Sequence, residues 1–342
     1  YVELFTTTVI SFFITSIIFV FTATKNDYKK LSDVVLTYAR YYLALYLLSY
    51  SFAKFYDGQF VLPNTARLEE KFGEASPMGL LWTFMGYSKT YTVFSGICEV
   101  LAGFLLFFRR TTVIGSIISF IVMTNVAVLN FAYDVPVKLF SVHLALISIF
   151  IFSPNVINLI QFFFFHKTTT LKIEKLELKN KWLKYGRIAI KSLTIIGFPI
   201  LFISSDLDYD EDVTQKHNLN AVYFTEEFIK NQDTIPHFME DSTRWDKFLI
   251  ADSYAKIFFN NDTQLFYKIS VDPSSQIITF ESYSDTTIAY NLKYRFISNK
   301  LFAVSGRFHS SDISATFRIK RINDYPLMKQ RFHWINEYPY NR

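Results

Sequence analysis

"RRTTVIGSIISFIVMTNVAVLNFAYDVPVKLFSVHLALISIFIFSPN" (residues 109–155) holds two apolar runs, 112–130 and 138–155, joined by a short polar turn. A helix that crosses the hydrocarbon core of a bilayer needs about 20 mostly apolar residues. Each run is close to that length, so the stretch predicts two membrane-spanning helices with a tight turn between them. Pro136, just before the second run, is typical of a helix start.

The rest of the chain divides into an apolar part and a polar part. Of its 342 residues, 51% are hydrophobic and 19% aromatic, too apolar for an ordinary globular protein and too polar for a purely membrane one. We expect a transmembrane domain at 1–205, an acidic linker at 206–218 and a second domain at 219–342. The run at 3–23 is interpreted as a retained span rather than a signal peptide. The six predicted spans are 3–23, 33–53, 88–108, 112–130, 138–155 and 187–205.

Basic residues concentrate in alternate connections between the predicted spans. The segment 166–191 alone holds eight Lys or Arg residues against two Glu. The positive-inside rule then places the basic connector 166–186 in the cytoplasm of a multi-pass bacterial inner-membrane protein. The N-terminus and the C-terminal domain are predicted on the periplasmic side. The stretch 171–185 is interpreted either as an amphipathic helix on anionic lipid or as a solvated linker.

Ionisable and amide side chains inside the spans are costly in hydrocarbon and therefore indicate a candidate site. These side chains are Arg40, Glu99, Asn125 and His143. At 1.5 Å per residue the last three fall in a similar layer, with Arg40 within reach of Glu99. One interpretation is a polar ligand pocket inside a helical bundle, where His143 exchanges protons. The alternative is structural: an Arg40–Glu99 pair that locks two helices, and His143 bonded to Asn125 or a backbone carbonyl.

Three further charged residues, Lys54, Asp134 and Lys138, are predicted at the outer rim of this bundle. The chain has one cysteine, Cys98, so it can form neither an intramolecular disulfide nor a CxxC redox pair. A lone buried cysteine is usually a small apolar filler, and we interpret Cys98 in that way.

After residue 205 the hydrophobic pattern alternates with period two, which is typical of half-buried antiparallel strands. "TIAYNLKYRFIS" (287–298) places apolar and aromatic side chains at every second position. About eight such strands predict an all-β domain, specifically a small antiparallel barrel of lipocalin-like type, with an open sandwich as the alternative. A ligand cavity and a packed core both agree with the pattern. The expected strands lie near 219–229, 245–251, 254–259, 263–271, 275–281, 286–297, 300–308 and 312–322.

The tail "QRFHWINEYPYNR" (330–342) is dense in side chains with an apolar body and a polar tip. It is interpreted either as a partner or interdomain contact or as a strap across one barrel end. The residues concerned are Arg331, His333, Trp334, Asn336, Glu337 and Arg342. Scattered histidines without ligand spacing, and the lack of phosphate-loop and hydrolase motifs, predict no metal site and no nucleic-acid partner.

Three segments resemble the DoxX-like family of membrane proteins: "ARYYLALYLLSYSFAKFYDGQF" (39–60), "SGICEVLAGFLLFFRRTTVIGSIIS" (95–119) and "NFAYDVPVKLFSVHLALISIFIFSP" (130–154). The resemblance covers about residues 33–155 and implies a compact four-helix membrane bundle. The ending of the chain is similar to that of a DoxX-like subgroup from Bacteroidetes-type bacteria. The family-like positions are Arg40, Lys54, Glu99, Gly103 and Arg109.

The resemblance implies two competing functions, because some DoxX-like proteins are linked to thiosulfate–quinone oxidoreduction and others to membrane complexes with thiol and oxidative-stress enzymes. In the first, the bundle is a quinone- or lipid-linked component of a membrane redox system. No cofactor is evident from the residues, and quinone is the candidate. In the second, the protein is a non-enzymatic partner or scaffold subunit of a cell-envelope complex, which binds another envelope protein through the β domain and tail. Membrane lipid is an expected partner in both, and whether the protein is an enzyme is left open.

Overall fold

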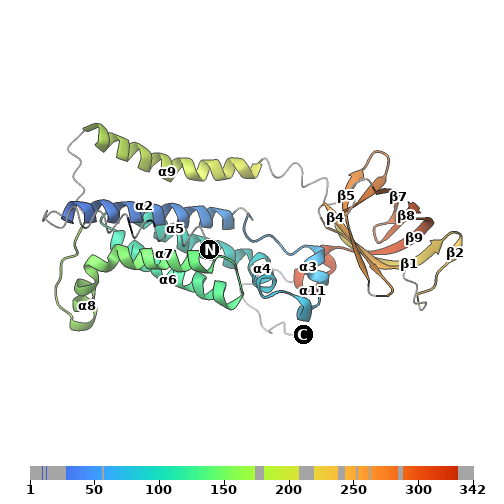
Figure 1. Cartoon of the computed structure of the whole chain (residues 1–342), viewed down its shortest axis with the longest axis horizontal. Helices are drawn as coiled ribbons and strands as arrows, with labels where there is room; N and C mark the ends of the chain where they lie inside the picture. Colours follow the sequence, from blue (N-terminus) through green and yellow to red (C-terminus); the bar gives the residue numbers. More distant parts are fainter. Residues whose placement is uncertain are drawn as a thin grey trace. The chain divides into compact units, whose positions relative to one another are not determined.

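The computed structural model describes residues 10, 13, 28–55, 58–173, 181–207, 219–237, 243–251, 253–261, 263–283 and 288–329. It divides into two compact units (Figure 1). The helical unit comprises Tyr1–Gln59 and Ser88–Phe202, and the barrel unit comprises Phe60–Tyr87 and Ile203–Arg342. The segment 60–87, which the sequence placed in the transmembrane domain, therefore belongs to the barrel unit.

The helical unit is built on long apolar helices. Their bounds are α2 (Tyr28–Phe55), α5 (Lys89–Leu106), α6 (Thr112–Ala132), α7 (Lys138–Phe152), the 3-10 turn η2 (Ser153–Asn155), α8 (Val156–Phe165) and α9 (Lys181–Leu207). The hydroxyl of Ser88 caps α5 by accepting a hydrogen bond from the Tyr91 backbone N–H. Between α6 and α7 the chain turns at Asp134, whose φ is 53°. Pro154 in η2 separates α7 from α8.

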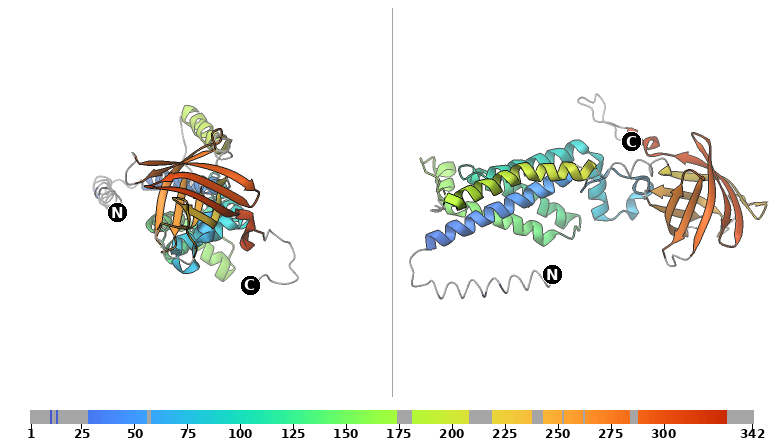
Figure 2. Two further views of the ribbon diagram at one scale, coloured as in Figure 1. Left: turned by 90° about the vertical axis from the view of Figure 1, so that its right-hand side faces the viewer. Right: turned by 90° about the horizontal axis from the view of Figure 1, so that it is seen from above.

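Helices α2, α5, α6 and α7 pack on one another as a bundle (Figure 2). Leu43, Leu47 and Leu106 are completely buried in its core. Gly103 lets α5 approach α2 closely, since an added Cβ would lie 3.2 Å from the Ala44 carbonyl oxygen. Small residues at such contacts are typical of helices that associate within membranes.

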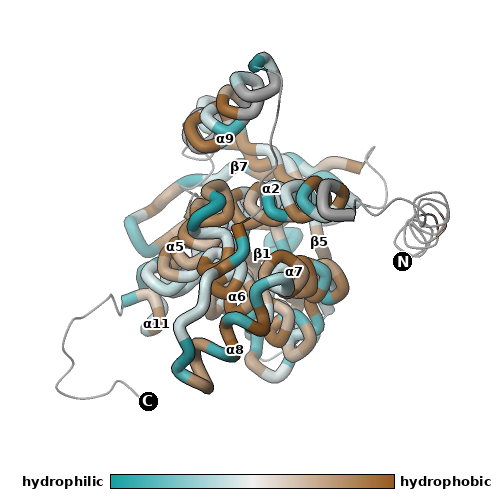
Figure 3. Tube along the Cα trace, turned by 90° about the vertical axis from the view of Figure 1, so that its left-hand side faces the viewer, coloured by the Kyte–Doolittle hydropathy of each residue, from teal (hydrophilic) through white to brown (hydrophobic). Residues whose placement is uncertain are grey.

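Within the described residues, three helical stretches are long and apolar enough to cross a membrane: Lys89–Leu106, Thr112–Ala132 and Lys138–Phe165. Hydrophobic colouring runs along α5, α6 and α7 in Figure 3. Three of the six predicted spans are thus supported by length and composition. The predicted spans 33–53 and 187–205 lie within α2 and α9, and the span 3–23 lies outside the described residues except for Ile10 and Phe13.

The barrel unit is all antiparallel. Its strands are β1 (Ala221–Lys230), β2 (Asp233–Thr234), β3 (Trp245–Ala251), β4 (Tyr254–Phe259), β5 (Gln264–Asp272), β6 (Ile277–Ser282), β7 (Ala289–Ser298), β8 (Leu301–Phe308) and β9 (Ser311–Lys320). They follow the order β2-β1-β3-β4-β5-β6-β7-β8-β9, and β1 also pairs with β9. That pairing closes eight strands into a barrel, with the two-residue β2 as a flap on β1. The predicted helical bundle plus antiparallel barrel is confirmed, and the sandwich alternative is wrong.

Aromatic side chains fill the barrel. Trp245 is buried and has ring contacts with Phe248, Phe280 and Phe308 at centroid distances of 5.6, 6.2 and 5.0 Å. Tyr223 stacks on Phe248 at 4.5 Å. An eight-stranded barrel is just wide enough for side chains to fill it. Buried side chains, many of them aromatic, therefore occupy the described interior, which agrees with the interpretation as a packed core.

The segment 60–87 forms α3 (Thr65–Glu69), η1 (Phe72–Glu74) and α4 (Pro77–Tyr87). Helix α3 packs on the outside of the barrel, where Ala66 contacts a small apolar cluster of Val222, Leu249 and Ala251. The Thr65 hydroxyl donates to the Ile250 carbonyl oxygen at 3.3 Å. After β9, η4 (Ile322–Asp324) and α11 (Pro326–Lys329) end the described chain. One outer face of the barrel is thus covered by the connection between α2 and α5.

Candidate functional site

A buried ion pair joins α2 to α5 inside the helical unit. Lys54 Nζ lies 2.6 Å from each carboxylate oxygen of Glu99. Both residues are buried. Charge-assisted contacts to both oxygens are the strong form of this interaction. Lys54 is therefore an interior residue of the bundle and not the rim residue that the sequence predicted.

Arg40 does not pair with Glu99. It is buried, its guanidinium donates to Thr112 Oγ1 at 3.2 Å, and it lies 5.2 Å from the centre of the Tyr41 ring. Residues 40 and 54 are separated by about 21 Å along a helix of 1.5 Å rise per residue. The predicted Arg40–Glu99 pair is wrong because only Lys54 is level with Glu99.

The antiparallel packing of α2 and α5 sets which residue of α2 lies at the same height along the bundle as Glu99. Gly96 faces the Phe55 ring, and Gly103 faces the Ala44 carbonyl. Glu99, between these glycines, is therefore level with the last turns of α2, where Lys54 lies. Counting depth from span boundaries placed Arg40 too close to Glu99, because it could not fix how far one helix is shifted along the other.

Asn125 and His143 do not face the bundle interior. Asn125 is exposed, while its neighbours Met123 and Ala127 are buried. A step of two residues rotates a side chain by about 200° around a helix, so Asn125 lies on the opposite face from both. His143 is also exposed, with its ring 6.2 Å from that of Tyr42. The predicted convergence of Arg40, Glu99, Asn125 and His143 on one pocket is wrong.

Other polar side chains link α6 to α7. The amide of Asn130 donates to Ser141 Oγ at 3.0 Å, and the hydroxyls of Ser119 and Ser148 are 2.9 Å apart. All four residues are buried. Interhelical bonds of this kind replace those that water cannot supply in hydrocarbon. The seven-residue spacing of Ser141 and Ser148, two helical turns, was the signal in the sequence that could have identified this face.

The turn between α6 and α7 holds a salt bridge between Lys138 and Asp134, four residues apart. The hydrogen bond and the charge of Lys138 lower the pKa of Asp134 below its ordinary value. The side chain of Asp134 is exposed, so the pair is screened by solvent. The predicted tail residues Arg331, His333, Trp334, Asn336, Glu337 and Arg342 lie outside the described residues.

Glu69, at the end of α3, is the centre of a second charged cluster, on the barrel's outer face. Its Oε1 accepts from Lys320 Nζ at 2.7 Å and from the Tyr325 hydroxyl at 2.8 Å. Its Oε2 accepts from Lys247 Nζ at 3.0 Å. Burial raises the pKa of Glu69, but the three hydrogen bonds outweigh it, so the net effect lowers that pKa. Burial and the bond to Glu69 raise the pKa of Tyr325.

The Glu69 cluster is one end of a row of alternating basic and aromatic side chains, which we call the outer row. Lys247 Nζ lies 5.6 and 5.0 Å from the ring centres of Phe224 and Phe258. Lys256 Nζ lies 4.6 and 4.9 Å from those of Phe258 and Phe266. These distances suit cation–π attraction. The members of the outer row are Phe224, Lys247, Phe258, Lys256 and Phe266.

The strand register explains the outer row. Phe224 on β1 pairs with Lys247 on β3, and Lys247 pairs with Phe258 on β4. Lys256, two residues before Phe258 on the same face of β4, pairs with Phe266 on β5. The row runs across strands, so no single strand's sequence shows it. A period-two pattern assigns faces within one strand and does not show which residues of neighbouring strands meet, so this row was not predicted from the sequence.

Part of this chain is similar to a bacterial protein. The "Uncharacterized protein YwoB" of Bacillus subtilis (strain 168) is 34% identical over 99 residues, which is 29% of this chain and 62% of that protein. The chain thus spans less than two thirds of that relative's length. No family model and no solved structure matches the chain.

Proposed function

We propose that this protein is a non-enzymatic, membrane-anchored subunit of a cell-envelope complex that binds a protein partner on the outer face of its barrel. Three apolar helices supply the anchor. The packed aromatic core makes the outside of the barrel the available binding surface. The proposed side is the periplasm, as predicted from the distribution of basic connections.

The observation that carries the proposal is the uncovered end of the outer row. Glu69 occupies the end that contains Lys247. At the other end Phe266 is 51% exposed, and Lys256 lies against its ring. Aromatic and basic side chains at such a spot are typical of the centre of a protein interface.

The covered end shows what chemistry this surface accepts. Helix α3 binds there with one carboxylate for the basic side chains and one small apolar residue, Ala66, for the cluster below. We therefore expect the partner to present an apolar side chain to Phe266 and, to Lys256, a carboxylate closer than Glu70 and Glu74, which act on that ammonium group through charge alone. The redox alternative stays a prediction, and the side chains on which it depended do not form one pocket.

The test is photo-crosslinking in native membranes, with a photoreactive residue at position 266 of the full chain, followed by mass spectrometry. We expect a protein adduct whose yield falls at least tenfold when Lys256→Glu is added. Lys293→Glu, an exposed residue of β7 with the same charge change, is the matched control and should leave the yield unchanged.

A yield that is equal in Lys256→Glu and in the control would contradict the proposal. A stoichiometric quinone in gently purified protein, retained by wild type and lost on Glu99→Gln, would instead favour the redox function. Crosslinking at position 266 tests the barrel unit, and quinone retention tests the helical unit, so one result does not depend on the other.

A further inference from the structure

The end of α8 exposes a run of large apolar side chains. Phe162, Phe163, Phe164 and Phe165 are 56, 63, 77 and 64% exposed. Helix α8 follows α7 after the break at Pro154 and turns away from the direction of α7 in Figure 1. Four consecutive exposed phenylalanines are costly in water. Their position at the end of a membrane-spanning stretch indicates contact with lipid.

The chain after α8 doubles back along it in a fixed way. His166 adopts a left-handed conformation with φ 51°, and the backbone N–H groups of His166 and Lys167 both donate to the Gln161 carbonyl, which closes the helix. Two asparagines of α8 and the preceding turn hold the returning segment, residues 167–173. Asn158 Nδ2 donates to the Thr170 carbonyl at 2.9 Å, and Asn155 Oδ1 accepts from the Lys172 N–H at 2.6 Å.

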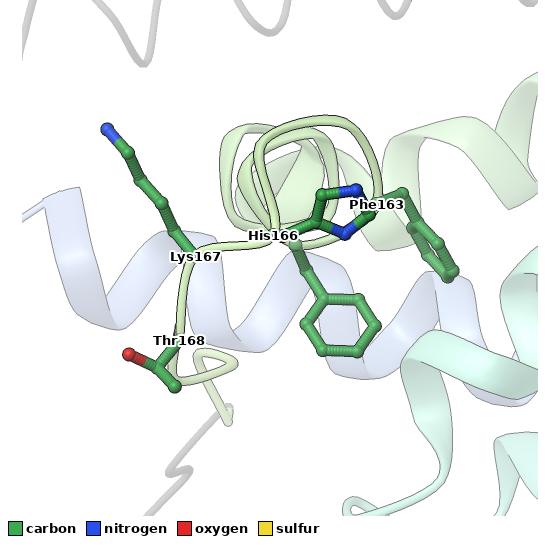
Figure 4. A pocket seen from close by; sticks show the side chains of 5 residues that line it. Phe163, His166, Lys167 and Thr168 are labelled. Carbon is green, nitrogen blue, oxygen red and sulfur yellow. The ribbon is translucent and has the colours of Figure 1, made fainter.

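This return places polar groups beside the phenylalanines. A hollow of about 320 Å³ is lined by Phe162, Phe163, His166, Lys167 and Thr168. Figure 4 shows the Phe163 ring and the His166 imidazole on one side of the turn, and the Lys167 and Thr168 side chains extending from its other side. One side offers aromatic rings, and the other offers a positive charge and hydrogen-bond donors. That pairing of chemistries matches a molecule with an anionic headgroup and an apolar chain.

We propose that the α8 turn, residues 162–168, is a binding site for an anionic phospholipid. The phosphate lies against Lys167 and Thr168, and an acyl chain lies against Phe162 and Phe163. The occupant is set by location, because membrane lipid is the phosphate-bearing amphiphile at the end of a membrane helix. Charge agrees as well, since the surrounding segment 166–191 holds eight basic residues against two acidic ones.

The first test asks whether the α8 turn is in lipid. The chain's single cysteine allows one label: on a Cys98→Ser background, Phe163→Cys carries the fluorophore NBD in the full chain reconstituted in vesicles. We expect blue-shifted emission and quenching by doxyl-labelled phospholipid. The matched control is Tyr283→Cys, an equally exposed aromatic position of the barrel unit, which should emit as in water. Water-like emission at position 163 would overturn the proposal.

The second test asks whether the lipid is anionic. Full-length protein in nanodiscs of equal phosphatidylglycerol and phosphatidylcholine is released, and the retained lipids are counted by native mass spectrometry. A basic residue near a membrane surface is worth about a fivefold preference for anionic lipid. We expect Lys167→Gln to lower the ratio of retained phosphatidylglycerol to phosphatidylcholine by about fivefold. Lys167→Arg should keep the ratio of the wild type, and Lys300→Gln in the barrel unit should leave it unchanged. Equal retention in all variants would overturn anionic recognition.

Discussion

Glu99 and Glu69 are two carboxylates held by lysines, and they differ in what surrounds them. Glu99 lies inside the helical unit with its side chain 2% exposed, and Lys54 takes both of its oxygens. Glu69 lies on the barrel's outer face, 12% exposed, and is shared among Lys247, Lys320 and Tyr325. The first is a one-to-one pair, and the second is a network.

The difference follows from the surrounding medium. In an apolar interior a charge that loses its partner is costly, because solvation by water is lost. At a partly hydrated surface a carboxylate can accept from several donors, and water balances the remaining positive charge. Removing one partner should therefore lower the free energy of unfolding strongly in the bundle and only moderately on the barrel.

The largest expected effect is at the buried pair. Glu99→Leu leaves the Lys54 ammonium uncompensated in the bundle, and Lys54→Met does the same to the carboxylate. Each should lower the free energy of unfolding by about 3–5 kcal/mol. The measurement is SDS-induced unfolding of the full chain in detergent micelles.

The double variant Lys54→Met with Glu99→Leu is the control, because it removes both charges and should recover most of the loss. If the single variants were as stable as wild type, the pair would be reached by water, and the contrast with Glu69 would disappear.

A smaller decrease in the free energy of unfolding is expected for Glu69→Gln. The amide keeps the shape of the side chain but weakens three charge-assisted hydrogen bonds, which should cost about 1–3 kcal/mol. Urea unfolding followed by tryptophan fluorescence measures the stability of the barrel unit, since Trp245 is buried in the barrel. Glu74→Gln makes the same charge change at an exposed residue of η1, whose ion pair with Lys71 is screened by solvent, and should cost less than about 1 kcal/mol. A loss equal in both variants would refute the network.

The Glu69 network should also depend on pH. Because the folded state lowers the pKa of Glu69, the network's contribution is fully present above the unfolded-state pKa of about 4.3. It is lost as the pH falls through the lower folded-state pKa. The stability difference between wild type and Glu69→Gln should be constant above about pH 5 and narrow below about pH 4. Urea midpoints measured from pH 3 to 7 test this, and a gap that widens in acid would contradict it.

The smallest effects are expected at Asn125 and His143. Both side chains are exposed on the described bundle, so Asn125→Leu and His143→Leu should change its stability by no more than about 0.5 kcal/mol. The same SDS titration measures them. A loss as large as that of Glu99→Leu would mean that these residues belong with the buried pair, and would revive the prediction of one shared pocket.

Local patterns predicted most elements of this chain. The apolar runs at 88–108 and 112–130 match α5 and α6, and the alternating run at 286–297 matches β7. These patterns succeed because helix and strand periodicities depend on residues that are neighbours in the sequence. They also predicted polar residues inside the spans, of which Glu99 is buried as expected.

The tertiary structure decided which residues meet. Lys54 rather than Arg40 is the partner of Glu99 because the shift of α5 along α2 is set by side-chain packing around Gly96 and Gly103. The outer row and the binding of Glu69 depend on strand register and on a segment about 180 residues away from β3 along the chain. Such relations arise from the rotation, shift and closure of whole elements, which periodicity within one element does not encode.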